Sequence, residues 1–419
     1  MNHSQSEESF PQQNDRRNIQ HVQCCIVGCG PAGAMLGYLL ARHGVDVLVL
    51  EKHSDFLRDF RGDTIHPSTI QIMNELGLAD RLLQLPHTKA PTLQVHTSRG
   101  PVTLADFRHL KTRWPYLVFL PQWDFLNFLT GEAQHYPGFH LLMNAEGQGL
   151  IEEDGEIRGV YYSTPEGRHE VRASLVVAAD GRASEIRKQA GLVPIGKAPP
   201  MDVLWFKLSQ RESDPDDTFA SVGEGHILGL INRRDYWQVA YVIPKGTYQR
   251  IHAAGLEQFK QSLRELVPQL ADRVDELQTW DQVKLLVVQA NRLRRWYRPG
   301  LLCIGDAAHA MSPVGGVGIN LAIQDAVIAA NVLAEPLKAG RVRIHHLAQV
   351  QGRREWPTRI IQALQSVAQQ RVTAPALSLS EPPKLPASIR MLLRLPLIHT
   401  LPARFIAFGV WPVHVRNTP

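Results

Sequence analysis

The sequence predicts an α/β fold in which one α/β domain is interrupted by an inserted, mainly antiparallel β-sheet domain and followed by a C-terminal helical tail. Near its start the chain has an apolar strand, a glycine-rich turn, a helix and a second strand, the pattern of a βαβ unit. Residues 91–107, and again about 199–243, change to short segments of alternating apolar and polar residues, as antiparallel strands do. A basic segment rich in proline ends the chain.

Length and composition set the limits of this prediction. The 419 residues, 44% of them hydrophobic and 20% charged, allow two or three domains with a large core. The net charge of +5 is modest, and no zinc-finger or RNA-binding signature occurs, so nucleic acid is not expected as a partner. The four cysteines form no C-x-x-C pair, and neither a signal-peptide start nor an 18-residue apolar run occurs. We therefore expect a cytoplasmic protein without disulfides.

The elements of the α/β domain follow from local patterns. Residues 1–20 are polar and predict a disordered lead-in. Residues 23–27 form a continuous apolar run typical of a buried parallel strand, and the turn 28–33 opens a helix that extends to about His43. Residues 45–50 are a second strand, which ends at Glu51.

Later elements follow by the same reasoning. Ser68 and Gln71 predict a capping box that starts a helix, which stops at Gly77. Apolar residues at 3-4-3-4 spacing predict a helix over 256–270. Residues 301–305 predict another buried strand, and 319–333 another apolar helix.

The turn after the first strand carries the clearest chemical signal. It reads Gly28-x-Gly30-x-x-Gly33, and Glu51 follows 18 residues after the last glycine, as in dinucleotide-binding sites. The first glycine permits a tight turn, the second lets backbone N–H groups approach a pyrophosphate, and the third lets helix and strand pack closely. The helix dipole favours the pyrophosphate, and Glu51 can accept hydrogen bonds from both adenosine ribose hydroxyls. The motif alone fits NAD, NADP or FAD.

Two later segments narrow this choice. A buried strand over 175–179 ends in Asp180-Gly181, and the strand over 301–305 ends in Asp306. An acid at the end of a buried strand can hold diol hydroxyls through charge-assisted hydrogen bonds. A glycine-rich loop then leads into a helix near Ile319, whose N-terminus directs positive dipole toward an anion.

With these three segments in order, residues 22–370 resemble the class A flavoprotein monooxygenases of the para-hydroxybenzoate hydroxylase type. The resemblance implies a glutathione-reductase-like Rossmann FAD-binding domain over 21–90, 108–190 and 285–370. It implies a substrate-binding β domain over 91–107 and 191–284, with 371–419 as the C-terminal segment. The FAD contacts that the motif and the resemblance imply are Gly28, Gly30, Pro31, Ala32, Gly33, Glu51, Lys52, Arg61, Gln122, Asp180, Gly181, Asp306, Gly318, Ile319 and Asn320.

Within this set, the resemblance implies that Asp306 binds the ribitol chain and that the backbone of 318–320 faces the N1 and C2 carbonyl edge of the flavin. Pro313 would lie beside the flavin ring, and the loop 61–67 would bring Thr64 or His66 near it as candidate catalytic groups. His309 is expected to be structural. Four aromatic residues could line a substrate pocket or pack in the core, and we expect core packing for each of them: Trp205, Phe206, Trp237 and Tyr241.

The resemblance implies an FAD-dependent monooxygenase that uses NAD(P)H and O2 to form a flavin C4a-hydroperoxide and hydroxylates an aromatic or other electron-rich small molecule. The cofactor carries this chemistry, and no triad or metal cluster is needed or found in the sequence. A second G-x-G-x-x-G for NAD(P)H is absent. The alternative is an FAD-dependent reductase or oxidase, similar to geranylgeranyl reductase, that inserts no oxygen; a redox-silent FAD-binding protein is a third possibility.

The C-terminal segment raises a separate question. Beyond Glu381 the chain has no acid, and residues 389–395 are basic and amphipathic, with further apolar residues at 405–408. Such a segment could make weak contact with an anionic membrane surface. We favour the alternative, in which it docks onto its own domain or onto a second subunit. The sequence leaves open the substrate, the choice between NADH and NADPH, and whether the protein is a monomer or a homodimer.

Overall fold

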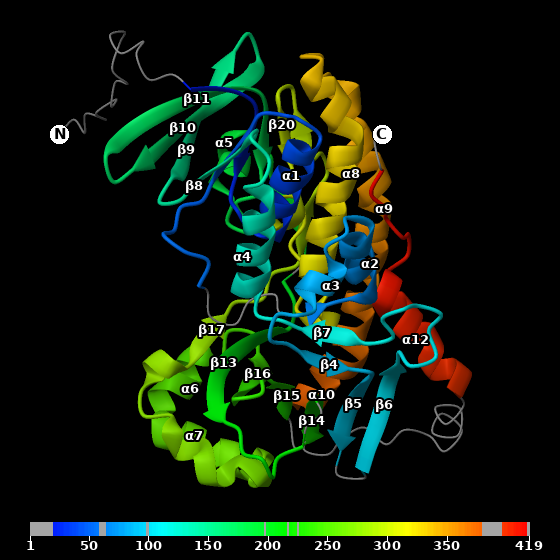
Figure 1. The fold of residues 1–419 in the computed structure, drawn as a ribbon. Coiled ribbons are helices and arrows are strands. Elements are labelled where there is room, and N and C mark those ends of the chain that lie inside the picture. Colours follow the sequence, from blue (N-terminus) through cyan, green and yellow to red (C-terminus); the bar gives the residue numbers. More distant parts are fainter. Residues whose placement is uncertain are drawn as a thin grey trace, which may run out of the picture.

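The computed structural model describes residues 20–57, 64–97, 100–196, 198–215, 218–223, 226–378 and 396–416 (Figure 1). It has an α/β fold with mixed sheets, as predicted. Six strands of the larger sheet lie in the order β19-β20-β11-β1-β2-β8, and the four contacts from β20 to β8 are parallel. The strands are β1 (Gln20–Val27), β2 (Val47–Leu50), β8 (Phe139–Leu142), β11 (Gly167–Ala178), β19 (Tyr297–Arg298) and β20 (Leu301–Cys303).

The central strands are buried on both faces, which explains their continuous apolar sequences. Cys24 lies beside Leu175 of β11 and Val47 of β2, and none of the three is exposed. β1 begins at Gln20, earlier than predicted, because its first residues pair with Val171 and its neighbours in β11. The predicted lead-in, apart from Gln20, lies outside the described residues.

Helices and a ribbon cover the two faces of this sheet. On one face lie α1 (Pro31–Arg42), α4 (Gln122–Ala133) and α8 (Gly318–Lys338), and α9 (Ile344–Ala368) packs on α8. On the other face lie β9 (Glu146–Glu153), β10 (Glu156–Thr164) and α5 (Glu185–Gln189). Gly147 of β9 comes so close to the sheet that an added Cβ would lie 2.7 Å from Cγ1 of Val27.

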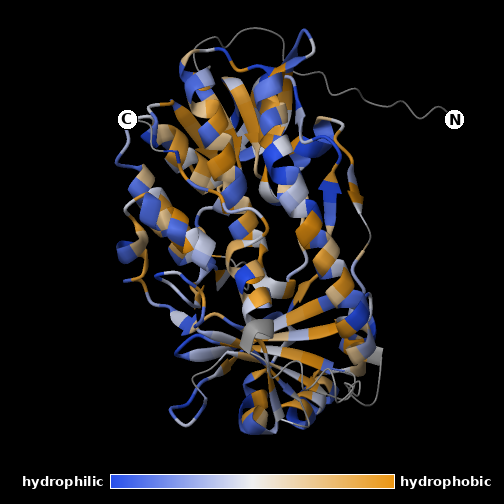
Figure 2. Cartoon of the chain, turned by 90° about the vertical axis from the view of Figure 1, so that its right-hand side faces the viewer, coloured by the Kyte–Doolittle hydropathy of each residue, from blue (hydrophilic) through white to orange (hydrophobic). Residues whose placement is uncertain are grey.

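α8 is the central helix of this part of the molecule. Among the described residues, the stretch Val314–Lys338 alone is long and apolar enough to cross a membrane, and 83% of its apolar window is buried inside the protein, as in a core helix. Figure 2 shows the same arrangement, with apolar strands and helix faces gathered inside and polar faces outside. α8 extends five residues beyond the predicted end, because apolar positions continue to Leu337.

A second sheet has seven strands in the order β17-β13-β16-β15-β14-β5-β6 (Figure 1). All of its contacts are antiparallel except that between β14 and β5. Its strands are β5 (Thr92–Thr97), β6 (Gly100–Asp106), β13 (Met201–Ser209), β14 (Phe219–Gly223), β15 (His226–Asn232), β16 (Tyr236–Pro244) and β17 (Lys284–Leu286).

α7 (Leu256–Leu266) covers one face of the seven-stranded sheet. Phe206 and Tyr241 meet the ring of Phe259 edge-on, and Trp237 belongs to the same buried cluster. Trp205 alternates with Phe206 and therefore lies on the opposite face. Three of the four aromatic candidates thus pack in the core, the role expected for each.

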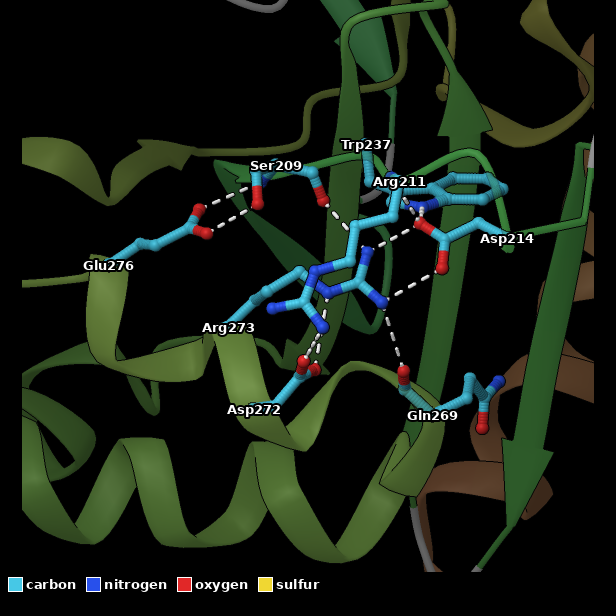
Figure 3. Close-up of polar contacts among 8 residues, drawn as sticks. All are labelled: Ser209, Arg211, Asp214, Trp237, Gln269, Asp272, Arg273 and Glu276. Carbon is cyan, nitrogen blue, oxygen red and sulfur yellow. Dashed lines mark hydrogen bonds and ion pairs between the residues drawn. The ribbon is translucent and has the colours of Figure 1, made fainter.

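A polar network links the seven-stranded sheet to the 3-10 helix Pro268–Glu276 (Figure 3). Arg273, in the 3-10 helix Pro268–Glu276, forms a nearly unexposed ion pair with Asp214, which follows β13. Asp214 also accepts a hydrogen bond from the indole of Trp237 at 3.0 Å, and Arg273 donates to the carbonyl of Ser209 at 3.0 Å. The predicted helix over 256–270 is divided here, because Pro268 ends α7 and Leu270 lies in the 3-10 helix.

The predicted capping box is wrong. α2 (Pro67–Glu75) has His66 as its N-cap, without a side-chain cap bond, and Pro67 as its first residue. Ser68 is therefore already inside the helix, where its backbone cannot adopt the extended N-cap conformation. Gln71 instead donates to the carboxylate of Glu75.

The C-terminal helix α12 (Pro396–Phe408) docks on the protein. It packs against β6 and α2, and Ala403 and Ala407 are fully buried against a cluster that includes Phe107 and Phe119 (Figure 1). Ile406, Ala407 and Phe408 thus contact the chain itself, whereas the basic stretch 389–395 lies outside the described residues.

Candidate functional site

The candidate residues meet where the parallel strands of the larger sheet end. Backbone hydrogen bonds link Gly28 to Leu50, Ala179 to Val27, and Ile304 to Ala178, with N–O distances of 2.7, 2.8 and 3.0 Å. The ends of β1, β2, β11 and β20 are therefore level with one another. In open α/β sheets this carboxyl edge is where ligands bind.

The three glycines of the first turn differ in what surrounds them. A Cβ on Gly28, whose φ is +97°, would lie 2.6 Å from the carbonyl oxygen of Ala179, and one on Gly33 would lie 1.9 Å from that of Gly28. A Cβ on Gly30 would meet nothing within 4 Å. Gly28 and Gly33 thus allow close packing of strand and helix, while Gly30 borders open space at the N-terminus of α1. The residues Pro31 and Ala32 form the first turn of that helix, which has no side-chain cap.

Glu51 lies directly beside this turn. Its carboxylate accepts hydrogen bonds from the backbone N–H of Cys29 at 3.0 Å and of His53 at 3.2 Å, and the residue is buried. Lys52 points to the surface, and Gln122 is the half-buried first residue of α4. Arg61 lies outside the described residues.

Asp180 follows β11 and touches the glycine turn, since a Cβ on Gly28 would lie 2.8 Å from its Cα. Its Oδ2 accepts hydrogen bonds from the N–H groups of Glu185 and Ile186. Its Oδ1 is buried without a partner among the described residues, and burial raises the pKa of this carboxyl. Gly181, next in the chain, has a φ of +86°.

Asp306 sits in a single 3-10 turn after β20, and its side chain is 36% exposed. The turn lies between two helices, because a Cβ on Gly305 would lie 3.1 Å from that of Ala32 and 3.5 Å from that of Ala322. Nε of Arg182 is 3.9 Å from Oδ2 of Asp306. The carboxylate is thus accessible beside the N-terminus of α1.

Arg187 links the two aspartate segments. It is buried, and its guanidinium donates to the carbonyls of Ala307 at 3.0 Å and Arg182 at 2.8 Å. No local sequence pattern indicates this link, which joins positions 120 residues apart.

The N-terminus of α8 is held by Asn320. Its Oδ1 accepts hydrogen bonds from the backbone of His66 at 2.9 Å and the hydroxyl of Thr69 at 2.7 Å. Its Nδ2 donates to the carbonyls of Thr64 at 2.9 Å and Gly316 at 3.1 Å. The Asn320 side chain thus fixes the loop before α8, while the backbone N–H groups of the first turn, Gly318 and Ile319 included, have no side-chain cap.

His66 connects this loop to the C-terminal helix. Its Nδ1 lies 2.7 Å from the carbonyl of Ile406, so Nδ1 carries the proton. Its Nε2 is buried without a partner among the described residues. Burial lowers the pKa of His66 to about 4, only partly offset by carbonyls of Ile406, Gly315 and Gly316, so the ring is neutral near pH 7.

A buried ion cluster below the site was missed by the sequence analysis. Asp325 of α8 accepts hydrogen bonds from Gly305 N–H at 3.0 Å, His309 Nε2 at 2.6 Å and Arg354 Nε at 2.8 Å. Burial raises the pKa of Asp325, but His309 and Arg354 outweigh it and hold the pKa below its usual value. The available signal was Asp325 itself, the one acid in the mainly apolar stretch 319–333.

These contacts fit a flavin dinucleotide. The open side of Gly30 leaves room for a diphosphate at the uncapped N-terminus of α1. The carboxylate of Glu51 lies beside the glycine turn, and the Asp306 turn lies against Ala32 of α1. No group of three metal-ligating side chains occurs among the described residues. A hollow of about 680 Å³, lined by His21 and Arg172 among others, lies at the opposite end of β1 and is unrelated to this site.

Known proteins share this architecture. The FAD binding domain family matches residues 21–363. The 6-methylpretetramide 4-monooxygenase of Streptomyces rimosus is 33% identical over 406 residues, 95% of this chain and 94% of that protein. A 12-dehydrotetracycline 5-monooxygenase/anhydrotetracycline 6-monooxygenase of the same species is 26% identical over 72% of this chain, which spans only 60% of that relative.

Solved structures agree at the level of the fold. The p-nitrophenol 4-monooxygenase PnpA from Pseudomonas putida DLL-E4 superposes with a TM-score of 0.72 at 20% identity, covering 94% of this chain and 95% of that one. Because the family match covers most of the chain, the protein belongs to the FAD binding domain family, which here groups it with class A flavoprotein monooxygenases. It is an FAD-dependent oxidoreductase.

Proposed function

We propose that the protein is an NAD(P)H-dependent monooxygenase that hydroxylates an aromatic or other electron-rich small molecule. The observation that carries this proposal is the meeting of the Gly28 turn, Asp180 and Asp306 at one sheet edge, with Gly30 open to a ligand. When bound there, FAD would accept electrons from NAD(P)H and activate O2 for transfer of one oxygen atom.

The chain's own residues would bind and orient the cofactor. The uncapped N–H groups of α1 would hold the diphosphate, Glu51 the adenosine ribose, and Asp306 the ribitol hydroxyls. The backbone of 318–320 at the N-terminus of α8 would face the pyrimidine edge of the flavin, where positive dipole favours the anionic reduced form. We also propose cofactor contacts for Gly181, Lys52, Arg61 and Gln122.

The two sheets would have different roles, one in binding the cofactor and the other in binding the substrate. Residues 21–90, 108–190 and 285–370 would form a glutathione-reductase-like Rossmann domain, and 91–107 with 191–284 a substrate domain. The substrate site would lie between the Pro313 loop and the face of the seven-stranded sheet away from α7. Trp205 lies on that face, and α10 (Ala374–Ser378) packs there against β15 and β16. Thr64, His66 and Pro313 would border the flavin ring.

Turnover with oxygen tests the proposal. The purified holoenzyme is given NADPH or NADH under labelled O2 with a panel of phenols that includes 6-methylpretetramide, chosen because the relative with 33% identity is named for it. We expect substrate-stimulated oxidation of one nucleotide and one labelled oxygen in the product. Reduction of the flavin without labelled product would favour the alternative, a reductase or oxidase.

The cofactor map has its own test. Asp306→Ala removes the proposed ribitol contact and should purify with little FAD, whereas Asp281→Ala, at an exposed position of the seven-stranded sheet domain, should keep it. Stoichiometric FAD in Asp306→Ala would refute the assignment of Asp306.

A further inference from the structure

The long helix α9 buries several polar side chains and exposes several apolar ones. A surface helix normally turns its apolar stripe inward. The buried face of α9 and of the π-helix after it, Gln369–Thr373, mixes polar side chains with apolar ones such as Leu347, Val350 and Ile361. The inward polar residues are Gln351, Arg354, Thr358, Gln362, Gln365 and Gln369. The exposed apolar residues are Trp356, Ile360, Leu364 and Val367.

Three of the inward glutamines bind one irregular segment, residues 310–314. Gln362 donates to the carbonyl of Ala310 at 3.2 Å. Gln365 donates to the carbonyls of Ser312 at 2.9 Å and Val314 at 2.7 Å. Gln369 donates to the hydroxyl of Ser312, which also accepts from the N–H of Val314. Hydrogen bonds from side chains at i, i+3 and i+7 thus hold this segment against α9 and the π-helix that follows it.

Gln365 donates two of these hydrogen bonds. It is buried, and its NH₂ group donates to the carbonyls on both sides of Pro313. Unpaired buried carbonyls are costly, so without Gln365 the segment must shift to find other donors or water. The segment leads directly into the turn Val314–Gly316 and the N-terminus of α8.

We propose that Gln365 is a positioning residue, which through the Ser312–Val314 segment sets the distance between the N-terminus of α8 and the flavin. This inference rests on the proposed function, because it takes the N-terminus of α8 to face the cofactor. A displaced N-terminus would favour the anionic reduced flavin less, so the midpoint potential of bound FAD should become more negative.

The test compares two glutamines of the same helical segment. Gln365→Met replaces the buried amide with a side chain of similar length. Gln370→Met does the same at an exposed glutamine whose amide donates to the hydroxyl of Ser366. Both holoenzymes are titrated for midpoint potential, and the visible circular dichroism of the bound FAD is recorded. For Gln365→Met we expect a changed spectrum and a potential lower by ~30 mV, about tenfold in the reduction equilibrium. Gln370→Met should match the wild type.

The outcomes separate this inference from the proposed function. If Gln365→Met keeps the wild-type potential and spectrum while melting at a lower temperature, Gln365 is structural only and the inference is wrong. If Gln365→Met does not retain FAD, Gln365→Asn decides, since it keeps the amide but shortens the side chain that reaches the carbonyls of Ser312 and Val314, and an unchanged potential again refutes the proposal. A wild-type protein that binds no FAD would instead refute the proposed function.

Discussion

At the scale of single residues, the same alanine substitution at Gly30 and at Gly33 should separate an effect on cofactor binding from an effect on folding. In Gly30→Ala the new Cβ meets no protein atom within 4 Å and φ is −72°, so the apoprotein should melt like the wild type. The methyl group would enter the diphosphate space, and FAD affinity should fall by about tenfold or more. In Gly33→Ala the new Cβ lies 1.9 Å from a carbonyl oxygen, so stability itself should fall by about 1–3 kcal/mol.

Melting of the two apoproteins and titration with FAD, followed by flavin fluorescence, check this pair. A Gly30→Ala apoprotein that melts well below the wild type would show that Gly30 serves the fold, and unchanged FAD affinity would remove it from the cofactor site.

His66 makes stability depend on pH. Its pKa of about 4 in the folded state lies below the ordinary value of about 6.5, so below about pH 6.5 the unfolded chain binds a proton that the folded protein does not. The contribution of His66 to the free energy of unfolding is fully present above pH 6.5. It is lost as the pH falls toward 4, with a slope of up to about 1.4 kcal/mol per pH unit.

Urea unfolding across this pH range measures the slope. His66→Asn has no titrating ring and should show a shallower loss of the free energy of unfolding than the wild type. Equal slopes in the two proteins would mean that other groups account for the acid sensitivity.

Residue-level prediction from sequence had a clear physical limit. Gly28, Asp180 and Asp306 were recognisable because each follows a buried strand in a local strand–turn–helix pattern. The structure brings them to one sheet edge. Arg187 and Gln365 act on backbone carbonyls 120 and about 50 residues away, and no local pattern encodes such partners.

At the scale of elements, Asp325 joins α8, α9 and the Asp306 turn. Asp325→Asn leaves the guanidinium of Arg354 buried without its charge partner, which should cost about 3–5 kcal/mol. Adding Arg354→Met removes the unpaired charge, so the double variant should recover part of the loss. Chemical denaturation of the three proteins measures both effects, and a double variant less stable than Asp325→Asn would contradict the charge argument.

The docking of α12 gives a second prediction for an element. Ala407 is fully buried against the cluster around Phe107, whereas Leu401 on the same helix is 72% exposed. Ala407→Glu buries an unpaired charge and should lower the melting temperature measurably, since ~1 kcal/mol shifts a protein of 150–250 residues by about 2–4 °C and a longer chain by less. Leu401→Glu should leave it unchanged. Equal melting of the two variants would mean that the helix does not depend on this contact.

At the scale of the whole molecule, the two sheets have separate cores. One buried cluster contains the strands and helices of the cofactor site, and another contains the face of the seven-stranded sheet covered by α7. Sequence periodicity predicted both kinds of sheet, because apolar runs and alternation are local. It did not predict the buried Arg273–Asp214 pair, whose members are 59 residues apart.

This separation predicts that the two parts lose structure independently. Arg273→Met leaves Asp214 almost unexposed and without its cation, which holds the pKa of Asp214 far below its usual range, so the seven-stranded part should be weakened by about 3–5 kcal/mol. The proposed FAD contacts that the structure describes lie at the larger sheet or on the helices that pack against it. The variant should therefore retain stoichiometric FAD and show an additional low-temperature transition by calorimetry. Arg211→Met, which breaks only an exposed pair with Asp272, should match the wild type. Release of FAD in the same low-temperature step would show instead that the cofactor site depends on both cores.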